Sequence, residues 1–434
     1  MFSDIKTLLR RFASLGAVRS FCKPLAENDN SKQQIYLGGS FDIVQMFPFD
    51  EVKACSAVNE PNFKAQLCFR WITADSVEPA PGAQLILYPE YPEVRLSGFL
   101  RGCKKAPNEH LRHIPADQRQ FNNGPDGRVL FFGVTGNGET LAYLAPAGSF
   151  LAQEFWRRQG AGEYSKESVF YALPLPYGDT KTILLSKLAE IRDFGWHSSI
   201  RLNKTGMAMP YKARNGGGYT LEALLGIIPN GRSEPDYLGW ELKAFSSDRV
   251  TLMTPEPDAG MYGETGVEPF VRRFGRPVSD DTLYFTGTHR AGCRNVTTGL
   301  TMNLRGFNPD KLVIEDVNGA IELLTDAGEN VAAWSFSDLM LGWNKKHAQA
   351  AYVPYLAKKD SEPAYRYFSP ALLGEGTDFS LYLSAISGGQ VIFDPGSKVM
   401  KASTSRSSVK ARSQFRISVK YLPALYRNFG PSEF

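Results

Sequence analysis

The stretch GGGYTLEALLGIIPNGRSEPDYLGWELKAF, residues 216 to 245, carries Glu222, Asp236, Glu241 and Lys243 among apolar residues. Thr220 is suited to cap a short helix with Glu222 in its first turn, and the Pro-Asn-Gly run at 229 to 231 would end that helix. A turn and then a strand would follow. The stretch therefore predicts that acidic and basic groups converge on a partly buried surface.

The end of this stretch predicts a β-strand with one polar and one apolar face. Glu241 and Lys243 would point to the same face because side chains alternate along a strand. The other face would hold Leu238, Trp240 and Leu242. Asp236 has the wrong parity for the polar face, so a bend is needed before Glu241, and Gly239 can supply it. A Lys and a Glu with an Asp nearby suit a divalent metal, a phosphate and an activated water.

Length and composition favour a globular protein of two domains. The chain has 434 residues, of which 43% are hydrophobic and 22% are charged, and a chain of this length exceeds one ordinary core. It contains no apolar run near the ~18 residues of a membrane span. The first residues, MFSDIKTLLRRFASLG, predict a helix and not a signal peptide.

The cysteines and histidines give no sign of a disulfide framework or a zinc site. The cysteines are scattered, odd in number and without a CxxC pair, which favours buried free thiols in a reducing cytoplasm. They are Cys22, Cys55, Cys68, Cys103 and Cys293. His110 and His113 lie near each other without partner cysteines, so no structural zinc is expected.

The two halves of the chain have different patterns. Up to about residue 145, short apolar segments alternate with Asn, Asp, Gly and Pro, which predicts a small β-barrel or sandwich. The run LPLPYGD at 173 to 179 resembles a linker, and we place a domain boundary at residue 178. The second half mixes helical spacing, as in LLSKLAEIRDFGW at 184 to 196, with strands such as RVTLMT at 249 to 254. We therefore expect a domain at 1–178 and an α/β domain at 179–434.

The last part of the chain is basic. Between Gly396 and Arg427 there are eight Lys and Arg residues and not one Asp or Glu. Such a run is commonly a solvated face. Because this one includes a predicted strand and accompanies a carboxylate cluster that would repel phosphates, we favour a track for a nucleic-acid backbone, with Lys410, Arg412 and Arg416 as contacts.

The spacing D-x4-E-x-K, with a Glu before it, resembles the PD-(D/E)xK nuclease superfamily. The PD is Pro235-Asp236, and the ExK is Glu241-Leu242-Lys243. The fuller string, TLEALLGI, then EPDYLGWELKAF, then TLMTPEPDAGMYG, resembles the MvaI/BcnI restriction endonucleases, relatives of the mismatch-repair nickase MutH. The resemblance covers much of residues 180 to 434.

This resemblance implies metal-dependent hydrolysis of a DNA phosphodiester. Asp236 and Glu241 would hold Mg2+, with the Leu242 carbonyl as a third ligand. Lys243 would orient the attacking water and stabilise charge on phosphorus, and Glu222 would support the metal-bound water or a second ion. Each residue also has an ordinary reading: helix-dipole stabilisation for Glu222, a surface ion pair for Lys243, and a turn for Asp236.

The amino-terminal half resembles the EcoRII-type effector domains, which are B3-like DNA-binding barrels. The resemblance rests on KPLAENDNSKQQIYLGGSFDIVQMFP at 23 to 48 and YPEVRLSGFL at 91 to 100. It implies DNA contacts by Glu93 and Arg95, since Arg reads guanine bidentately and Glu accepts from cytosine N4. Lys32 and Gln34 are further candidates, although they replace a His-containing stretch, and Tyr91 and Val94 replace basic positions. A surface ion pair between Glu93 and Arg95, and a solvated Lys32, are the alternatives.

The two resemblances together predict a bacterial, cytoplasmic type II restriction endonuclease. It would be a monomer with one active site per chain, acting on double-stranded DNA at a short C·G-rich site such as CCWGG. Its amino-terminal domain would bind a second target copy, as in type IIE enzymes. Three rivals stay open: a nuclease restricted to modified DNA, a MutH-like repair nickase, and a DNA-binding protein without activity.

Overall fold

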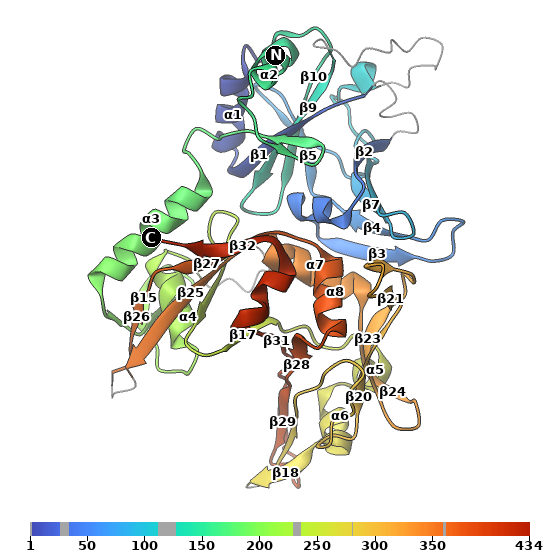
Figure 1. The fold of residues 1–434 in the computed structure, drawn as a ribbon, viewed down its shortest axis with the longest axis vertical. Helices are drawn as coiled ribbons and strands as arrows, with labels where there is room; N and C mark the ends of the chain where they lie inside the picture. The colour runs from blue at the N-terminus through green and yellow to red at the C-terminus, as the bar shows by residue number, and fades with distance from the viewer. Residues whose placement is uncertain (1, 27–33, 112–126, 229–235, 280, 359–361) are drawn as a thin grey trace.

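The computed structural model describes residues 2–26, 34–111, 127–228, 236–279, 281–358 and 362–434. Figure 1 shows the amino-terminal half in the upper part of the molecule and the carboxy-terminal half below it, with helix α3 (Thr180–Phe194) along the left edge of the lower half. The predicted helix at 184–196 is thus confirmed. It starts earlier than its apolar spacing indicates because the Asp179 carboxylate accepts hydrogen bonds from the amides of Lys181 and Thr182.

The amino-terminal half contains two sheets. The first has seven strands in the order β11-β12-β1-β9-β10-β5-β6, and the second has five in the order β2-β8-β7-β4-β3. The strands of the first are β1 (Ala17–Pro24), β5 (Phe69–Ile72), β6 (Val77–Pro79), β9 (Val129–Thr135), β10 (Thr140–Ala145), β11 (Lys166–Glu167) and β12 (Phe170–Ala172). Those of the second are β2 (Gln34–Gly38), β3 (Glu51–Cys55), β4 (Asn62–Gln66), β7 (Gln84–Tyr88) and β8 (Glu93–Ser97).

A closed barrel is not seen in this half. Neither sheet closes on itself within the described residues, and the chain passes back and forth between them, as at β1–β2, β4–β5, β6–β7 and β8–β9. The short 3-10 helices η1 (Phe41–Met46) and η2 (Asn108–Leu111) lie beside the strands. The prediction of strand-rich structure is correct, whereas closure into a B3-like barrel is not confirmed.

Two helices cover the seven-stranded sheet. They are α1 (Ile5–Ser14) and α2 (Phe150–Gly160), and their apolar faces share a buried cluster with the sheet. Gly133 of β9 lies directly under the Phe12 ring, where a Cβ atom would come within 2.8 Å of the ring. The first helix is therefore part of the core, as its amphipathic pattern predicts.

The carboxy-terminal half is built on a mixed sheet of six strands. Its main path is β13-β26-β25-β27-β32, and β16 pairs with β25 in parallel. The strands are β13 (His197–Ser198), β16 (Glu241–Phe245), β25 (Gln349–Lys358), β26 (Ala364–Tyr367), β27 (Ala371–Thr377) and β32 (Tyr426–Ser432). Helices α3 and α4 (Gly216–Leu224) pack on this sheet through a buried cluster that includes Leu188, Leu221 and Trp240.

A second lobe of this half holds smaller sheets, which extend downward in Figure 1. Their strands are β17 (Arg249–Met253), β18 (Arg276–Ser279), β19 (Thr282–Thr286), β20 (Thr301–Arg305), β21 (Phe307–Asn308), β22 (Val313–Ile314), β23 (Ala320–Leu324), β24 (Asn330–Ser335), β28 (Val391–Phe393), β29 (Gly396–Met400), β30 (Ser408–Lys410) and β31 (Phe415–Ser418). The hairpin β14 (Ile200–Leu202) and β15 (Ala208–Pro210) belongs to the α4 side. The helices are α5 (Gly260–Thr265), α6 (Val267–Phe274), α7 (Phe336–His347), α8 (Phe379–Ser387) and η4 (Val419–Leu425).

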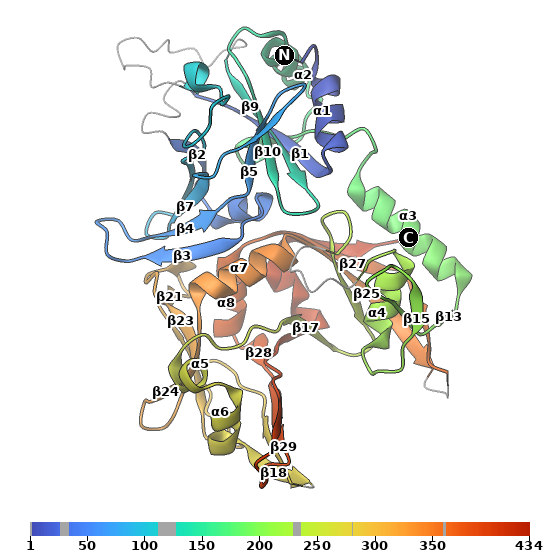
Figure 2. The ribbon, with the colours of Figure 1, turned by 180° about the vertical axis from the view of Figure 1, so that it is seen from behind.

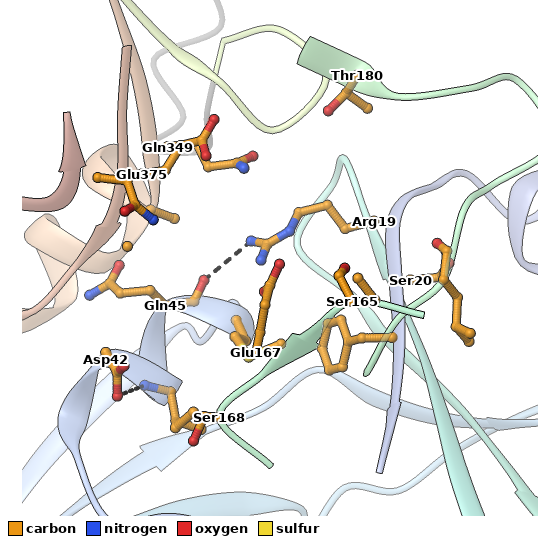
Figure 3. Close-up of a pocket in the computed structure, with 18 of the residues that line it drawn as sticks. Arg19, Ser20, Asp42, Gln45, Ser165, Glu167, Ser168, Thr180, Gln349 and Glu375 are labelled. Carbon is orange, nitrogen blue, oxygen red and sulfur yellow. Dashed lines mark hydrogen bonds between the residues drawn. The ribbon is translucent and has the colours of Figure 1, made fainter. Parts of the chain in front are cut away.

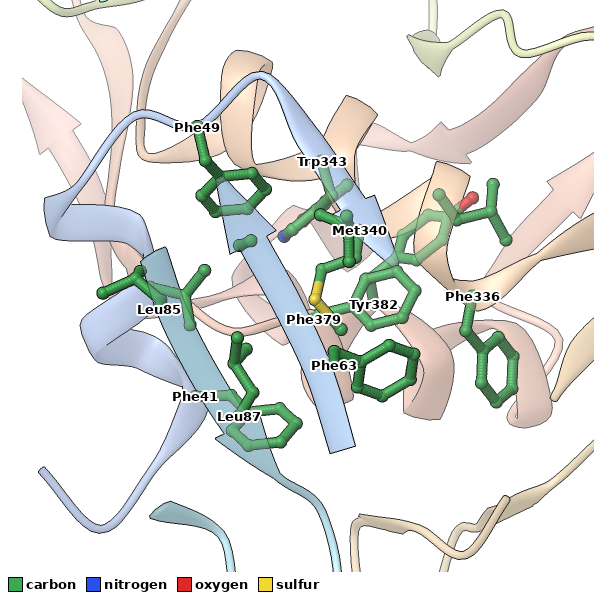
Figure 4. Packing of buried hydrophobic residues seen from close by; sticks show 14 of the residues in the cluster. Phe41, Phe49, Phe63, Leu85, Leu87, Phe336, Met340, Trp343, Phe379 and Tyr382 are labelled. Carbon is green, nitrogen blue, oxygen red and sulfur yellow. The ribbon is translucent and has the colours of Figure 1, made fainter. Parts of the chain in front are cut away.

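The two halves share one packed core. Figure 4 shows Phe49 and Phe63 of the amino-terminal half against Met340 and Trp343 of α7 and Tyr382 of α8. All five side chains are buried. Burying aromatic groups of this size contributes about 1.5–3 kcal/mol each, so the halves stabilise one another. The boundary at residue 178 stays a prediction.

No helix among the described residues is long and apolar enough to pass through a bilayer. All five cysteines are free thiols, as predicted. Their expected burial holds for Cys22 but is wrong for Cys293, which is exposed.

Candidate active site

Glu222 lies in the last turn of α4, not in the first turn as its sequence context predicts. The helix starts at Gly216, because Gly216 and Gly217 fit against the rings of Tyr365 and Tyr355, where a Cβ atom would come within 2.4 Å or less. Thr220 is therefore inside the helix and does not cap it. Its hydroxyl instead pairs with the backbone of Ile200.

The predicted bend before Glu241 is present. Leu238 and Gly239 have φ angles of 50° and 88°, and Tyr237 and Trp240 exchange backbone hydrogen bonds of 2.9 and 2.8 Å around them. The left-handed φ suits Gly239 and is costly at Leu238. The turn brings Asp236 back to β16, where its carboxylate accepts a 2.9 Å hydrogen bond from the Leu242 amide. Pro235 lies outside the described residues.

Glu241 and Lys243 share one face of β16, as the alternation predicts. The Lys243 ammonium donates to Glu241 Oε1 over 2.8 Å. Glu241 is only 3% exposed, and its Oε2 is buried without a hydrogen-bond partner. The reading of Lys243 as an exposed surface lysine does not fit its side chain, which is 13% exposed. A buried carboxylate with one free oxygen is costly unless something else binds there.

A second lysine reaches the same carboxylate. The Lys346 ammonium, at the end of α7, lies 3.5 Å from Glu241 Oε1. The stretch WSFSDLMLGWNKKHAQAAYVP, from residue 334, has the pattern of a helix with Lys345 and Lys346 on its polar side, but that pattern gives no link to the D-x4-E-x-K motif. Only the packing of α7 beside β16 reveals the contact.

Burial and neighbouring carboxylates raise the pKa values of Glu222 and Asp236. Burial, followed by repulsion from Asp236 and Glu241, raises the pKa of Glu222 to about 7. Burial and the Glu241 charge raise the pKa of Asp236 to about 6, against the hydrogen bond from the Leu242 amide, which lowers it. Lys243 and Lys346 oppose both shifts only in part. The cluster therefore has more negative charge than its own lysines offset.

These residues fit a divalent cation. No group of three or more His, Cys, Asp or Glu side chains that could hold a metal ion occurs in the described part of the chain. The cluster offers a different donor set: the Asp236 and Glu241 carboxylates, with the Leu242 carbonyl as the predicted third ligand. Glu241 Oε2 has no hydrogen-bond partner, and the pKa values of Glu222 and Asp236 are raised. A positive charge at this point would bind the free oxygen and favour the ionised form of both carboxyl groups.

Three of the four amino-terminal DNA-reading candidates lie together. Arg95 forms an ion pair with Glu93 and donates a 3.1 Å hydrogen bond to Gln34 Oε1 across the β2–β8 pairing. Its guanidinium also lies over the Tyr88 ring, 5.3 Å from the centroid. Lys32 lies outside the described residues. This ion pair agrees with the alternative interpretation of Glu93 and Arg95 as a surface ion pair. Their role in the recognition of DNA bases stays a prediction.

The basic carboxy-terminal residues differ in their exposure to solvent and in whether an acidic side chain already pairs with them. Lys410, on β30, and Arg412 are exposed. Arg416, on β31, is half-buried and forms a 2.7 Å ion pair with Asp394, so its charge is largely offset. Arg427 instead pairs with Asp42 of the amino-terminal half. The segment is therefore not one uniform basic surface.

Two solved structures of MvaI resemble part of the chain. One, titled a complex of restriction endonuclease MvaI with cognate DNA substrate, has 19% sequence identity, a TM-score of 0.43, and coverage of 58% of this chain and 97% of that one. The other, MvaI in the absence of DNA, has 16% identity, a TM-score of 0.33, and coverage of 58% and 98%. No curated protein sequence matches the chain.

A family comparison covers the whole carboxylate and lysine cluster. The sequence model of the MvaI/BcnI restriction endonuclease family matches residues 185–426, which is more than half of the chain and includes α4, β16 and α7. The chain belongs to the MvaI/BcnI restriction endonuclease family.

Proposed function

We propose that this restriction endonuclease hydrolyses DNA with Mg2+ at a single cluster per chain, formed by Glu222, Asp236, Glu241 and Lys243. The observation that carries the proposal is the buried Glu241 carboxylate, which binds Lys243 through one oxygen and leaves the other unpartnered. Asp236 and Glu241 are the proposed ion ligands, together with the Leu242 carbonyl. A bound Mg2+ supplies Lewis-acid charge at the scissile phosphate.

The chain's own residues supply orientation and proton transfer. Lys243, fixed by Glu241, directs an N–H toward the reacting phosphate oxygen or the attacking water, so its charge is in place as negative charge develops. Glu222 has a pKa of about 7, which suits a group that takes a proton from water near neutral pH. The Leu242 amide keeps the Asp236 carboxylate turned toward β16.

We further propose that the amino-terminal half reads a second DNA segment. Gln34, Glu93 and Arg95 lie near β2 and β7, far from α4 in both views of the ribbon (Figures 1 and 2). Arg95 can exchange its Glu93 partner for the acceptor atoms of guanine, and Glu93 can then accept from cytosine N4. This chemistry supports a short C·G-rich target of the CCWGG type and type IIE behaviour. Lys410 and Arg412 are proposed backbone contacts, with Arg416 and Lys32 as weaker candidates.

One active site per chain implies that the two strands are cut in succession by a monomer. Digestion of a plasmid by the purified protein with Mg2+ should therefore give a nicked circle before the linear product. Final products that stay nicked support a repair nickase instead. Cleavage only of methylated phage DNA supports a modification-dependent enzyme. We place this activity in the bacterial cytoplasm.

The decisive experiment is a Mg2+-dependent digest followed by sequencing of the cleaved ends. Asp236→Ala, Glu241→Ala and Lys243→Ala should each abolish cleavage and keep DNA binding in EDTA. Asp193→Ala, on the exposed end of α3, is the matched control and should cut like the wild type. Full activity in any of the three variants removes that residue from the mechanism, and an inactive wild type with every divalent ion supports a DNA-binding role without catalysis.

A further inference from the structure

The last turn of α7 connects the amino-terminal half to the active site. Asn344 is 4% exposed and donates hydrogen bonds of 2.7 and 3.5 Å to the carbonyls of Val44 and Phe47. The next residue, Lys345, lies 3.8 Å from Asp50 in an exposed ion pair. Two consecutive residues of one helix turn therefore hold the segment from η1 to β3 of the amino-terminal half.

The third residue of this turn, Lys346, faces the nuclease chemistry. Its ammonium lies 3.5 Å from Glu241 Oε1, the same oxygen that binds Lys243. The opposite oxygen, Oε2, stays unpartnered. Lys346 thus neutralises and holds Glu241 without occupying the oxygen that is free for a cation.

A second contact between the halves lies at the turn before Glu241. The turn at Gly239 approaches Val18 and Arg19 of β1, since a Cβ atom built there would lie 3.8 to 3.9 Å from both side chains. Figure 3 shows Arg19 hydrogen-bonded to the Gln45 carbonyl in a cavity of about 880 Å³ that Gln349 and Glu375 of the carboxy-terminal half also line. The amino-terminal half therefore borders both the turn that precedes Glu241 and the helix end that presents Lys346.

We propose that Lys346 is a second active-site lysine, a positioning residue for Glu241, and that the amino-terminal half holds it in place through Asn344. The proposal rests on the proposed nuclease function of the cluster. Two lysines face three carboxylates there, so the loss of one leaves Glu241 less well held and the site more repulsive toward phosphate. The amino-terminal half is then needed for catalysis even when only one DNA segment is bound.

The first test replaces Lys346. Lys346→Ala should lower kcat about 100-fold, which is the size of effect expected when one fixed charge is lost from an active site. Lys346→Arg should restore part of the rate, because it returns the charge. In EDTA, without a metal ion, Lys346→Ala should also reduce the slope of log affinity for DNA against log salt concentration by about 1. Lys187→Ala, on the exposed face of α3, is the control and should change none of these.

The second test asks whether Asn344 acts through Lys346. Asn344→Ala should lower kcat about tenfold by letting the α7 end shift, and it should have less than about a twofold effect in a Lys346→Ala background. Because Asn344→Ala removes two hydrogen bonds from a buried site, Asn344→Ser and a thermal unfolding scan show whether the protein stays folded. A folded Asn344→Ser with the same dependence on Lys346 supports the proposal.

The proposal is overturned if Lys346→Ala keeps the kcat and the salt slope of the wild type. It is also overturned if the fold-losses in kcat of the Asn344 and Lys346 variants multiply in the double variant, because the two residues would then act independently. Neither result touches the proposed function, provided that the wild type cuts and Asp236→Ala does not. An inactive wild type removes the proposed function first.

Discussion

The acidic cluster should make the metal-free protein less stable as the pH rises, and replacing Glu222 by Gln should remove the part of that effect that comes from this residue. The pKa of Glu222 is raised to about 7 in the folded protein from an ordinary value of 4.5. Between these values the folded state holds a proton that the unfolded state has lost. Stability from this group is therefore highest below pH 4.5 and falls as the pH rises to about 7.

The size of the effect follows from the shift. A change of one pKa unit corresponds to about 1.4 kcal/mol, so the shift of Glu222 sets an upper limit of about 3 kcal/mol at pH 8. Since Glu222 keeps some solvent exposure, we expect about 2 kcal/mol. Glu222→Gln is uncharged at every pH and similar in shape. It should be about 2 kcal/mol more stable than the wild type at pH 8 in EDTA and nearly equal at pH 4.5.

Urea unfolding followed by circular dichroism, in EDTA at both pH values, measures this difference. Taking the difference between wild type and variant cancels the titration of the groups that do not interact with Glu222. Saturating Ca2+, used as a probe cation, should stabilise the wild type at pH 8 and reduce the gap to Glu222→Gln. A variant that is less stable than the wild type at pH 8 would refute the inference that Glu222 is held beside uncompensated negative charge.

Four further outcomes are expected. The apparent affinity for Mg2+ should fall as the pH drops from 8 to 6, because Asp236, with a pKa of about 6, and Glu222 then gain protons; isothermal calorimetry measures it. Lys243→Met should lower kcat by about 100- to 1,000-fold with unchanged DNA affinity, measured by single-turnover cleavage and gel shift. Gly217→Ala should cost about 1–3 kcal/mol, seen as a lower Tm, because the new methyl meets the Tyr355 ring. Arg95→Ala should weaken binding of C·G-rich duplexes by about 1–3 kcal/mol without abolishing basal cleavage, measured by fluorescence anisotropy.

Local sequence was enough to predict the shared face of Glu241 and Lys243 and the bend before them. Both follow from the two-residue period of a strand and from one glycine between Asp236 and Glu241. Local sequence was misleading for α4, because Thr220 has the chemistry of a cap but lies inside the helix. Three successive glycines ordinarily argue against a helix start. The first two, Gly216 and Gly217, are used here because Tyr365 and Tyr355 leave no room for side chains, and that depends on strands more than a hundred residues away.

The contacts of α7 show why long-range parts of a site escape sequence reasoning. A helix with Lys345 and Lys346 on its polar side predicts solvated lysines, and nothing in the local pattern separates them. The parallel pairing of β16 with β25, which follows α7 directly, brings the helix end beside Glu241. The barrel prediction is not confirmed for a similar reason, since strand-length segments reveal neither which sheet each strand joins nor whether the sheet closes.

The packing of the two halves also limits how DNA binding in one can influence cutting in the other. Phe49 and Phe63 are buried against α7, so a large separation of the halves would expose aromatic surface at a cost of several kcal/mol. A small shift of the α7 end costs far less free energy than a separation of the halves. Because the Lys346 ammonium lies 3.5 Å from Glu241, a shift of about 1 Å is enough to change the rate of cleavage. If occupation of the Arg95 region alters cleavage, the geometry favours a change at the Asn344 turn over an opening of the two halves.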